Sequence, residues 1–202
     1  MQHVAMNPRP PFTATRPTPL RRRLIALAAA LSLTAIAASA ADAPRLAGTV
    51  VGISDGDTVD VRLQSGQIRV RLHGIDAPER DQPGGKASRR ELSQLVYRRE
   101  IELEPIEQDR YDRLVARLWL DRMDVNAELV KRGAAWVYRR YATEAAWCAL
   151  EKQARDRRLG LWALPAEQRV APWEWRRRDR REGKFTDYST QRVAECVAGL
   201  GR

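Results

Sequence analysis

The chain has 202 residues and a mass of 23.0 kDa, which is room for one domain of ordinary size followed by a tail. Its 36 Lys and Arg outnumber 26 Asp and Glu, and the charge of +10 favours a polyanionic partner: nucleic acid, an anionic membrane surface or an acidic polymer. Two Cys exclude a disulfide framework and a Cys-based zinc site, and two His argue against a His-rich metal centre. Carboxylates would therefore hold any metal, which favours a hard cation such as calcium or magnesium.

The first forty residues have the pattern of a secretory signal peptide. Residues 1–23 carry five Arg and no acid, residues 24–38 form an apolar run, and an A-x-A site ends at Ala40. The apolar run is shorter than the roughly 20 residues that a membrane span needs. We expect cleavage after Ala40, export to the periplasm or the medium, and no membrane anchor in the mature chain. The mature chain then has 31 basic and 26 acidic residues, a charge of +5.

Three strands are predicted in the first part of the mature chain. Apolar residues over 50–53 and alternating patterns over 59–63 and 67–75 each indicate a strand. An Asp-Gly pair at 55–56 favours a tight hairpin turn between the first two, and a Ser-Gly pair at 65–66 favours a turn before the third. The three strands therefore form an antiparallel meander.

Helices and two further strands alternate in the next part of the chain. The predicted elements are a helix over 86–99, strands over 101–105 and 115–120, and helices over 124–131 and 143–158. Asp124 and Thr143 are the expected N-caps of the last two helices, and Gly133 and Gly160 are their expected ends. Five short strands with helices after the third and the fifth indicate a mainly β fold with α-helices, a five-stranded barrel of the OB type.

The periodic pattern degrades from Pro165 onward. Trp173 and Trp175 are followed by a run of five Arg and one Asp over 176–181. We interpret residues 165–202 as a basic C-terminal tail, packed at its Trp end, that follows a domain spanning 41–164. Export permits a disulfide between the two cysteines at 148 and 196, but the sequence supplies no distance between them.

Charged residues gather where predicted strands begin and end. Asp57 begins a strand, where Asp is unfavourable, and Asp76 and Glu79 follow the third strand on a loop stiffened by a proline. Two carboxylates on such a loop, near a third on an adjacent strand, suit a hard cation. Arg71 alternates with apolar neighbours, and Arg113 ends a turn before the fifth strand. Taken singly, each residue also has a plain explanation as a turn, a cap or a solvated charge.

Taken together, these segments resemble the staphylococcal-nuclease (thermonuclease) family, in particular its extracytoplasmic bacterial members. The resemblance is carried by DGDT, by an R-x-x-x-x-D-x-P-E string that follows, and by a Tyr-x-Arg before a strand, and it covers residues 47–162. It implies an OB-like barrel with three helices. It also implies a calcium-dependent nuclease that hydrolyses the phosphodiester bonds of DNA and, we expect, of RNA, and leaves 3′-phosphates.

The resemblance assigns three kinds of site residue. The metal ligands would be Asp57, Asp76 and the main-chain carbonyl of Ala77; the catalytic residues would be Arg71, Glu79 and Arg113; the substrate-binding residues would be Arg110, Tyr111 and Tyr138. The family often has Thr where this chain has Ala77, but a main-chain ligand makes that change a small one. Arg110 stands where the best-known member has Lys, which leaves the base preference open.

Two other functions fit parts of the sequence. One is an OB-type module that binds single strands through charge and stacking without cleaving them. The other is an exported protein that coats anionic envelope polymers through its Arg-rich tail. The presence of all five charged motif residues favours the nuclease over both. We expect a nucleic-acid substrate, no stable protein partner and a monomer.

Overall fold

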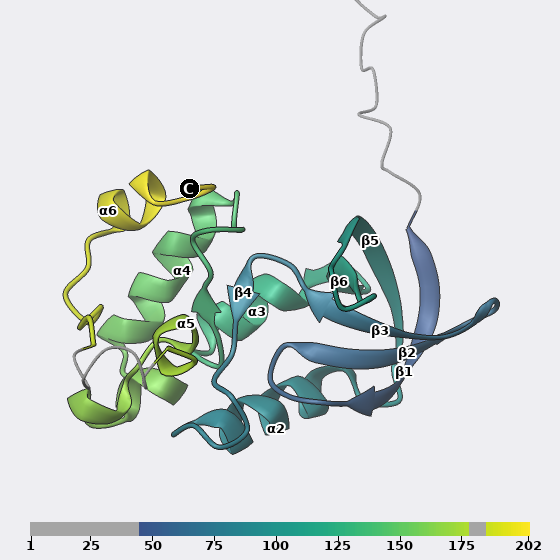
Figure 1. Ribbon diagram of the computed structural model, residues 1–202, viewed down its shortest axis with the longest axis horizontal. Helices are drawn as coiled ribbons and strands as arrows, with labels where there is room; N and C mark the ends of the chain where they lie inside the picture. Colours follow the sequence, from purple (N-terminus) through teal and green to yellow (C-terminus); the bar gives the residue numbers. More distant parts are fainter. Residues whose placement is uncertain (1–44, 178–184) are drawn as a thin grey trace, which may run out of the picture. The chain divides into compact units, whose positions relative to one another are not determined.

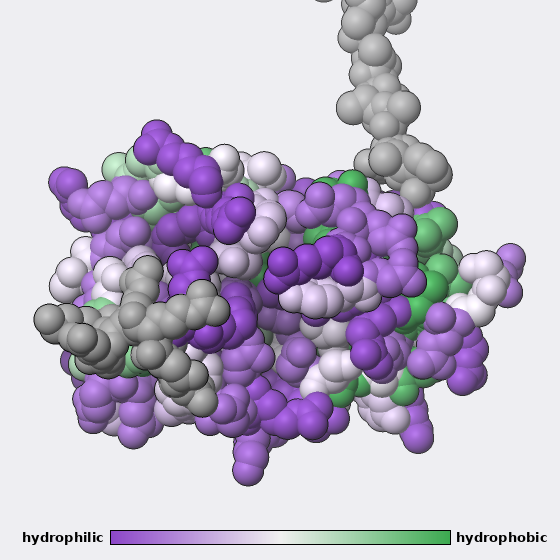
Figure 2. All heavy atoms as spheres, in the orientation of Figure 1, coloured by the Kyte–Doolittle hydropathy of each residue, from purple (hydrophilic) through white to green (hydrophobic). Residues whose placement is uncertain are grey.

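The computed structural model describes residues 45–177 and 185–202, so the expected signal peptide over 1–40 lies outside the described residues. The described residues form one compact unit. Figure 1 shows the long strands of this unit gathered on the right and the helices that follow residue 144 gathered on the left. Hydrophilic residues dominate the face drawn in Figure 2. Within the described ranges, every helix is too short or too polar to cross a membrane.

Five strands close into a barrel. They are β1 (Leu46–Ile53), β2 (Thr58–Leu63), β3 (Gly66–Leu72), β5 (Glu100–Gln108) and β6 (Leu114–Leu120). The order is β3-β2-β1-β5-β6 with antiparallel neighbours, and a parallel pairing of β3 with β6 joins the two ends. Closure leaves the barrel without a free edge between these strands. The predicted meander and the predicted five-stranded OB-like barrel are both confirmed.

The alternating apolar residues of the strands fill the barrel. The residues exposed by at most 1% include Val50, Val59, Val61, Val70, Leu72, Leu103 and Leu118. Burying each such side chain stabilises the fold by roughly 1.5–3 kcal/mol relative to exposing it. The barrel is therefore a packed core, and function must lie at its mouth and on the loops around it.

The helices lie where the sequence predicts them, except at the ends of the last one: its predicted end at Gly160 is wrong, because that helix ends at Asp156, and its predicted cap is wrong too. The three longer ones are α2 (Gly85–Val96), α3 (Val125–Lys131) and α4 (Ala145–Asp156). The Asp124 carboxylate caps α3 by accepting the Ala127 N–H at 3.1 Å, as predicted. The predicted cap at Thr143 is wrong, because α4 begins one residue later, with Glu144 at the N-cap position and no side-chain cap bond.

The predicted third strand is in fact two strands with different partners. β3 ends at Leu72, and β4 (Ile75–Asp76) leaves the barrel sheet to pair with β8 (Trp136–Val137). Gly74 makes the break, since its φ of +69° is left-handed and a Cβ there would meet the Trp147 ring at 2.7 Å. The break carries Asp76 out of the barrel wall.

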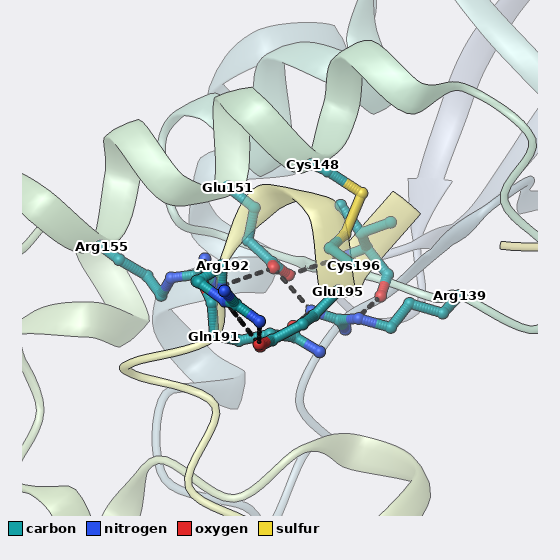
Figure 3. Close-up of a disulfide and its surroundings, with 9 residues drawn as sticks. Arg139, Cys148, Glu151, Arg155, Gln191, Arg192, Glu195 and Cys196 are labelled. Atoms are coloured by element: carbon teal, nitrogen blue, oxygen red, sulfur yellow. Dashed lines mark hydrogen bonds and ion pairs between the residues drawn. A yellow bond between two sulfur atoms is a disulfide. The ribbon is translucent and has the colours of Figure 1, made fainter. Parts of the chain in front are cut away.

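Residues after Pro165 form short helices packed on the domain. They are η2 (Ala166–Gln168), α5 (Pro172–Trp175) and α6 (Val193–Ala198). Two other short elements precede Pro165: the strand β7 (Met123–Asp124) and η1 (Gly160–Ala163). A disulfide joins Cys148 in α4 to Cys196 in α6, beside an ion-pair cluster centred on Glu151 (Figure 3). The described part of the C-terminal stretch is thus tied covalently to the domain.

Candidate active site

A pocket of about 780 Å³ opens at the barrel mouth, and all nine residues singled out from the sequence line it. They are Asp57, Arg71, Asp76, Ala77, Glu79, Arg110, Tyr111, Arg113 and Tyr138. The pocket lies where β2 begins, where β3 ends and where the β5–β6 loop turns. The strand order therefore gathers residues that are far apart in the sequence.

Asp57 is held at the pocket by backbone contacts on both sides. Its carbonyl accepts the Leu72 N–H at 2.8 Å, and its Oδ2 accepts the Ala77 N–H at 2.6 Å. The expected tight Asp-Gly hairpin is wrong, because β1 and β2 are joined by the four residues 54–57. Gly56 is instead required by close packing, since a Cβ would lie 2.6 Å from the Ala77 Cβ.

Arg71 joins the two predicted metal-binding carboxylates. Its Nη2 lies 3.1 Å from Asp57 Oδ2 and 2.9 Å from Asp76 Oδ1, while its Nη1 donates to the Leu72 carbonyl at 3.0 Å. Both carboxylates are buried, Asp76 almost completely. Because one nitrogen contacts an oxygen of each, the two carboxylates face a common point.

Burial is the main influence on the protonation of these carboxyl groups. It raises the pKa of Asp57 well above its ordinary value near 3.8, and attraction to Arg71 only partly offsets this. Burial also raises the pKa of Asp76, against the opposing effect of Arg71 and Arg176. Burial disfavours the charge of Arg71 too, but the two carboxylates outweigh that cost and raise its pKa. Such strongly perturbed groups in a pocket are typical of active sites.

Glu79 is positioned by a glutamine that the sequence analysis did not single out. The Gln82 side-chain oxygen accepts the Glu79 N–H at 3.2 Å, and its amide donates to the Val170 carbonyl at 2.6 Å. Gly85 packs so closely that a Cβ would lie 2.0 Å from the Glu79 carbonyl oxygen. The Glu79 loop is therefore braced by the start of α2 and by the C-terminal stretch.

Arg176, directly after α5, is a second residue of the site that was missed. Its Nη2 lies 2.7 Å from Asp76 Oδ2, and its Nη1 lies 3.2 Å from Asp76 Oδ1 and 2.7 Å from Glu79 Oε1. The Arg run looked like a solvated tail, and only the Trp-Glu-Trp before it hinted at ordered structure. This contact links the C-terminal stretch to both acidic residues of the β4 loop.

Arg113 reaches the pocket from the β5–β6 loop, with a carboxylate partner of its own. Asp109 accepts the Arg113 Nε–H at 2.8 Å and the Tyr111 N–H at 2.9 Å. Burial disfavours the charge of Asp109, but these bonds outweigh it and lower its pKa. The Arg113 guanidinium lies 5.4 Å from the centre of the exposed Tyr111 ring, and that of Arg110 lies 4.8 Å from it. The loop thus presents two cations around one aromatic ring.

Tyr138 is the least available of the predicted substrate-binding residues. Its ring stacks on Trp173 with centroids 5.3 Å apart, and it meets Tyr141 edge to face at 4.9 Å. One face of the ring is therefore covered by the protein itself. The exposed Tyr141 and Tyr111 leave more aromatic surface at the pocket rim.

The oxygen atoms at the pocket suit a hard cation. Across the described residues, acidic, His and Cys side chains do not gather in groups of three or more that could hold a metal ion. The two carboxylates that face a common point, Asp57 and Asp76, together with the Ala77 main chain offer hard donors of the kind that calcium prefers. Two guanidinium groups now satisfy these carboxylates, so a cation would have to share or replace their contacts.

A closed OB-like barrel with carboxylates and arginines at its mouth is the arrangement of a phosphodiester-hydrolysing enzyme. The family model for staphylococcal nuclease homologues matches residues 69–164. The chain is 42% identical to a micrococcal nuclease of Shigella flexneri over 141 residues, which cover 64% of this chain and 80% of the relative. It is 38% identical over 168 residues to the protein ParB of Escherichia coli, covering 78% of this chain and 94% of the relative. The chain belongs to the staphylococcal nuclease family.

A further relative is an uncharacterized endonuclease of Haemophilus influenzae, 37% identical over 142 residues, which are 70% of this chain and 78% of that protein. These relatives extend the match well beyond the range of the family model. The chain is therefore a nuclease, a hydrolase of phosphodiester bonds, and its substrate is nucleic acid.

Proposed function

We propose that this nuclease depends on calcium, is exported, and cleaves DNA and RNA to leave 3′-phosphates. The observation that carries the proposal is the convergence of Asp57, Asp76 and Glu79 with Arg71 in one pocket. A module that only binds single strands needs charge and aromatic surface but not this set of carboxylates, in which Asp57 and Asp76 are buried. The carboxylates are costly to bury, and cation binding would explain that cost.

The metal ligands would be Asp57, Asp76 and the main-chain carbonyl of Ala77. When bound, calcium supplies positive charge that offsets the charge of the phosphodiester and favours attack by water. Glu79 would accept a proton from the attacking water or orient it for in-line attack. Each role falls to a side chain whose loop is braced in the fold, which limits the reorganisation needed before reaction.

The two predicted catalytic arginines would act on the phosphoryl group. Negative charge grows on the equatorial phosphoryl oxygens in the transition state, and the planar guanidinium of Arg71 or Arg113 can donate two parallel hydrogen bonds to them. Arg71 is fixed by the Leu72 carbonyl, and Arg113 by Asp109. Their approach from β3 and from the β5–β6 loop would place donors on two sides of the scissile phosphate.

The substrate strand would run along the aromatic and basic rim of the pocket. Tyr111 is 64% exposed and lies beside Arg110, so it offers a stacking face for a base next to a charge for a phosphate. Tyr138 would contribute its uncovered side.

The signal-peptide pattern supports export to the periplasm or the medium. The Cys148–Cys196 disulfide is consistent with an oxidising compartment, where such bonds persist. We infer a monomer that carries no membrane anchor after cleavage of the signal peptide.

The proposal is tested by digesting heat-denatured DNA and RNA in calcium, magnesium or EGTA. Cleavage should require calcium, magnesium should replace it poorly because it demands tight octahedral geometry, and end-group analysis should find 3′-phosphates. The Glu79→Gln variant should lose about 100- to 10,000-fold in kcat while keeping its DNA affinity in EGTA. Glu107→Gln, which changes another carboxylate of the same pocket, is the matched control. Undiminished cleavage in EGTA would contradict the proposal, as would equal losses of binding and cleavage in Glu79→Gln.

A further inference from the structure

We propose that Arg176 takes the place of the cation in the metal-free protein, and that a metal must displace this guanidinium in order to bind. The inference rests on the calcium dependence proposed above and adds a residue outside the range matched by the family model, 69–164. It makes Arg176 a latch: a side chain that closes the metal site from within the same chain.

The contacts of Asp76 are the first argument. Its Oδ2 accepts from Arg176 at 2.7 Å, and its Oδ1 is shared between Arg71 at 2.9 Å and Arg176 at 3.2 Å. Arg176 also holds Glu79 Oε1 at 2.7 Å. Both Asp76 oxygens are therefore engaged by guanidinium groups, and a cation that binds this carboxylate must take over contacts from one of them.

Arg176 is the arginine that can leave. The Arg71 side chain is 14% exposed and is anchored to a backbone carbonyl within the barrel, whereas the Arg176 side chain is 41% exposed and faces the pocket from its rim. A partly exposed guanidinium that loses its partners is rehydrated, so its departure costs less than that of a buried one.

The charge balance points the same way. Asp57, Asp76 and Glu79 oppose Arg71 and Arg176, which leaves one negative charge in excess while the latch is closed. When Arg176 swings away, two negative charges remain in excess, which matches a divalent cation. Arg176 and the cation are thus alternative ways to neutralise the same carboxylates.

The backbone that carries Arg176 is firmly held, so only its side chain needs to move. Trp173 stacks on Tyr138, and the buried Glu174 accepts the Thr186 N–H at 2.9 Å. Farther along the chain, the Cys148–Cys196 disulfide fixes α6 on α4 (Figure 3). The latch is therefore presented to the site at a fixed position, as a competitor within the molecule.

Calorimetric titration of calcium into the purified protein, Arg176→Gln and Arg177→Gln tests the latch. Arg177 is the matched control, because it lines the same pocket and carries the same charge next to Arg176. Arg176→Gln should bind calcium about three- to tenfold more tightly than the wild type, since no ion pair has to break. Arg177→Gln should show a smaller change, owing only to the loss of a nearby charge.

Thermal unfolding separates the latch from a purely structural role. Arg176→Gln should unfold at a lower temperature than the wild type in EDTA, and this difference should vanish at saturating calcium, where Arg176 is already displaced. Equal calcium affinities for all three proteins, or weaker binding by Arg176→Gln, would overturn the latch and leave the calcium-dependent nuclease standing. If none of the proteins binds calcium and cleavage proceeds in EGTA, both the latch and the calcium assignment are wrong.

Discussion

Two clusters of carboxylates and arginines adjoin the same small sheet, and they differ in how their charges are satisfied. At the pocket, Asp76 in β4 meets Arg71 and Arg176. On the helical side, Glu151 in α4 accepts the Val137 N–H of β8 at 3.0 Å and meets two further arginines, both at 2.8 Å (Figure 3). Each cluster thus has one nearly inaccessible carboxylate held by two guanidinium groups.

The difference lies in the charge that is left over and in the space beside it. The Glu151 cluster has two arginines for one carboxylate, an excess of positive charge, and these arginines also donate to backbone carbonyls: Arg139 to Val137 and Arg155 to Gln191. The pocket cluster adds Asp57 and Glu79, has an excess of negative charge, and faces about 780 Å³ of open space. A carboxylate held between guanidinium groups in the interior stabilises the fold, whereas a cluster with excess negative charge beside a pocket can take up a cation.

The largest expected effect is on stability, and it comes from removing the carboxylate of the Glu151 cluster. Glu151→Gln should lower the free energy of unfolding by about 3–5 kcal/mol, because it leaves two buried guanidinium groups without their counter-charge. Urea unfolding followed by circular dichroism measures this. Glu195→Gln, which removes an exposed carboxylate in the same neighbourhood, should leave the midpoint nearly unchanged. A midpoint for Glu151→Gln equal to that of the wild type would break the comparison.

The next effect concerns the arginine that joins the two pocket carboxylates. Arg71→Lys keeps the charge but loses the planar pair of donors, so kcat should fall about 100- to 1000-fold. Steady-state cleavage of a short DNA substrate measures the loss. Arg69→Lys, two residues earlier on the same strand and paired with Asp60 at the surface, is the control and should cleave normally. Full activity in Arg71→Lys would show that a point charge is sufficient.

The smallest expected effect is a gain in stability. Burial raises the folded-state pKa of Asp57, so the stability it contributes is present below the unfolded-state pKa and is lost as pH rises through the folded-state pKa. In EDTA at neutral pH, Asp57→Asn should therefore raise the free energy of unfolding, because the variant buries no carboxylate charge at this position. Its stability should also vary less with pH than that of the wild type.

Asp60→Asn, a change to a more exposed carboxylate on β2, three residues after Asp57, is the control for this pH dependence. A destabilised Asp57→Asn protein at neutral pH would mean that the attraction between Asp57 and Arg71 outweighs the cost of burial.

Local patterns predicted most of the helices and strands, because periodicity and caps depend on residues that are close together in the sequence. Alternation marked the barrel strands, and Asp124 was recognisable as a cap because its partner lies three residues away. The break in the third strand was missed, since Gly74 is required by a contact with the distant Trp147 rather than by its neighbours. A strand pattern of period two does not reveal where the chain changes sheets.

The candidate site was likewise predicted only in part from the sequence. The motif residues were found through their spacing, which resembles a known family, and the fold brings them to one pocket. Gln82 and Arg176 were missed because their partners lie far away in the chain: Val170 for Gln82, and Asp76, 100 residues earlier, for Arg176. Inside a run of arginines, one residue that pairs with distant carboxylates leaves no mark on composition or periodicity.

The most direct test of the contrast between the two clusters is the single-turnover cleavage rate of Asp76→Asn and Glu151→Gln, measured on folded protein in saturating calcium. We predict that Asp76→Asn stays folded and that its cleavage rate falls at least about 100-fold. The reason is that the pocket loses the carboxylate that would bind calcium and that contacts Arg71 and Arg176. Glu151→Gln, although less stable, should cleave at nearly the wild-type rate per folded molecule. Comparable losses of cleavage rate in both folded variants, or full activity in Asp76→Asn, would contradict the account. Catalysis could then not be assigned to the pocket and stability to the Glu151 cluster.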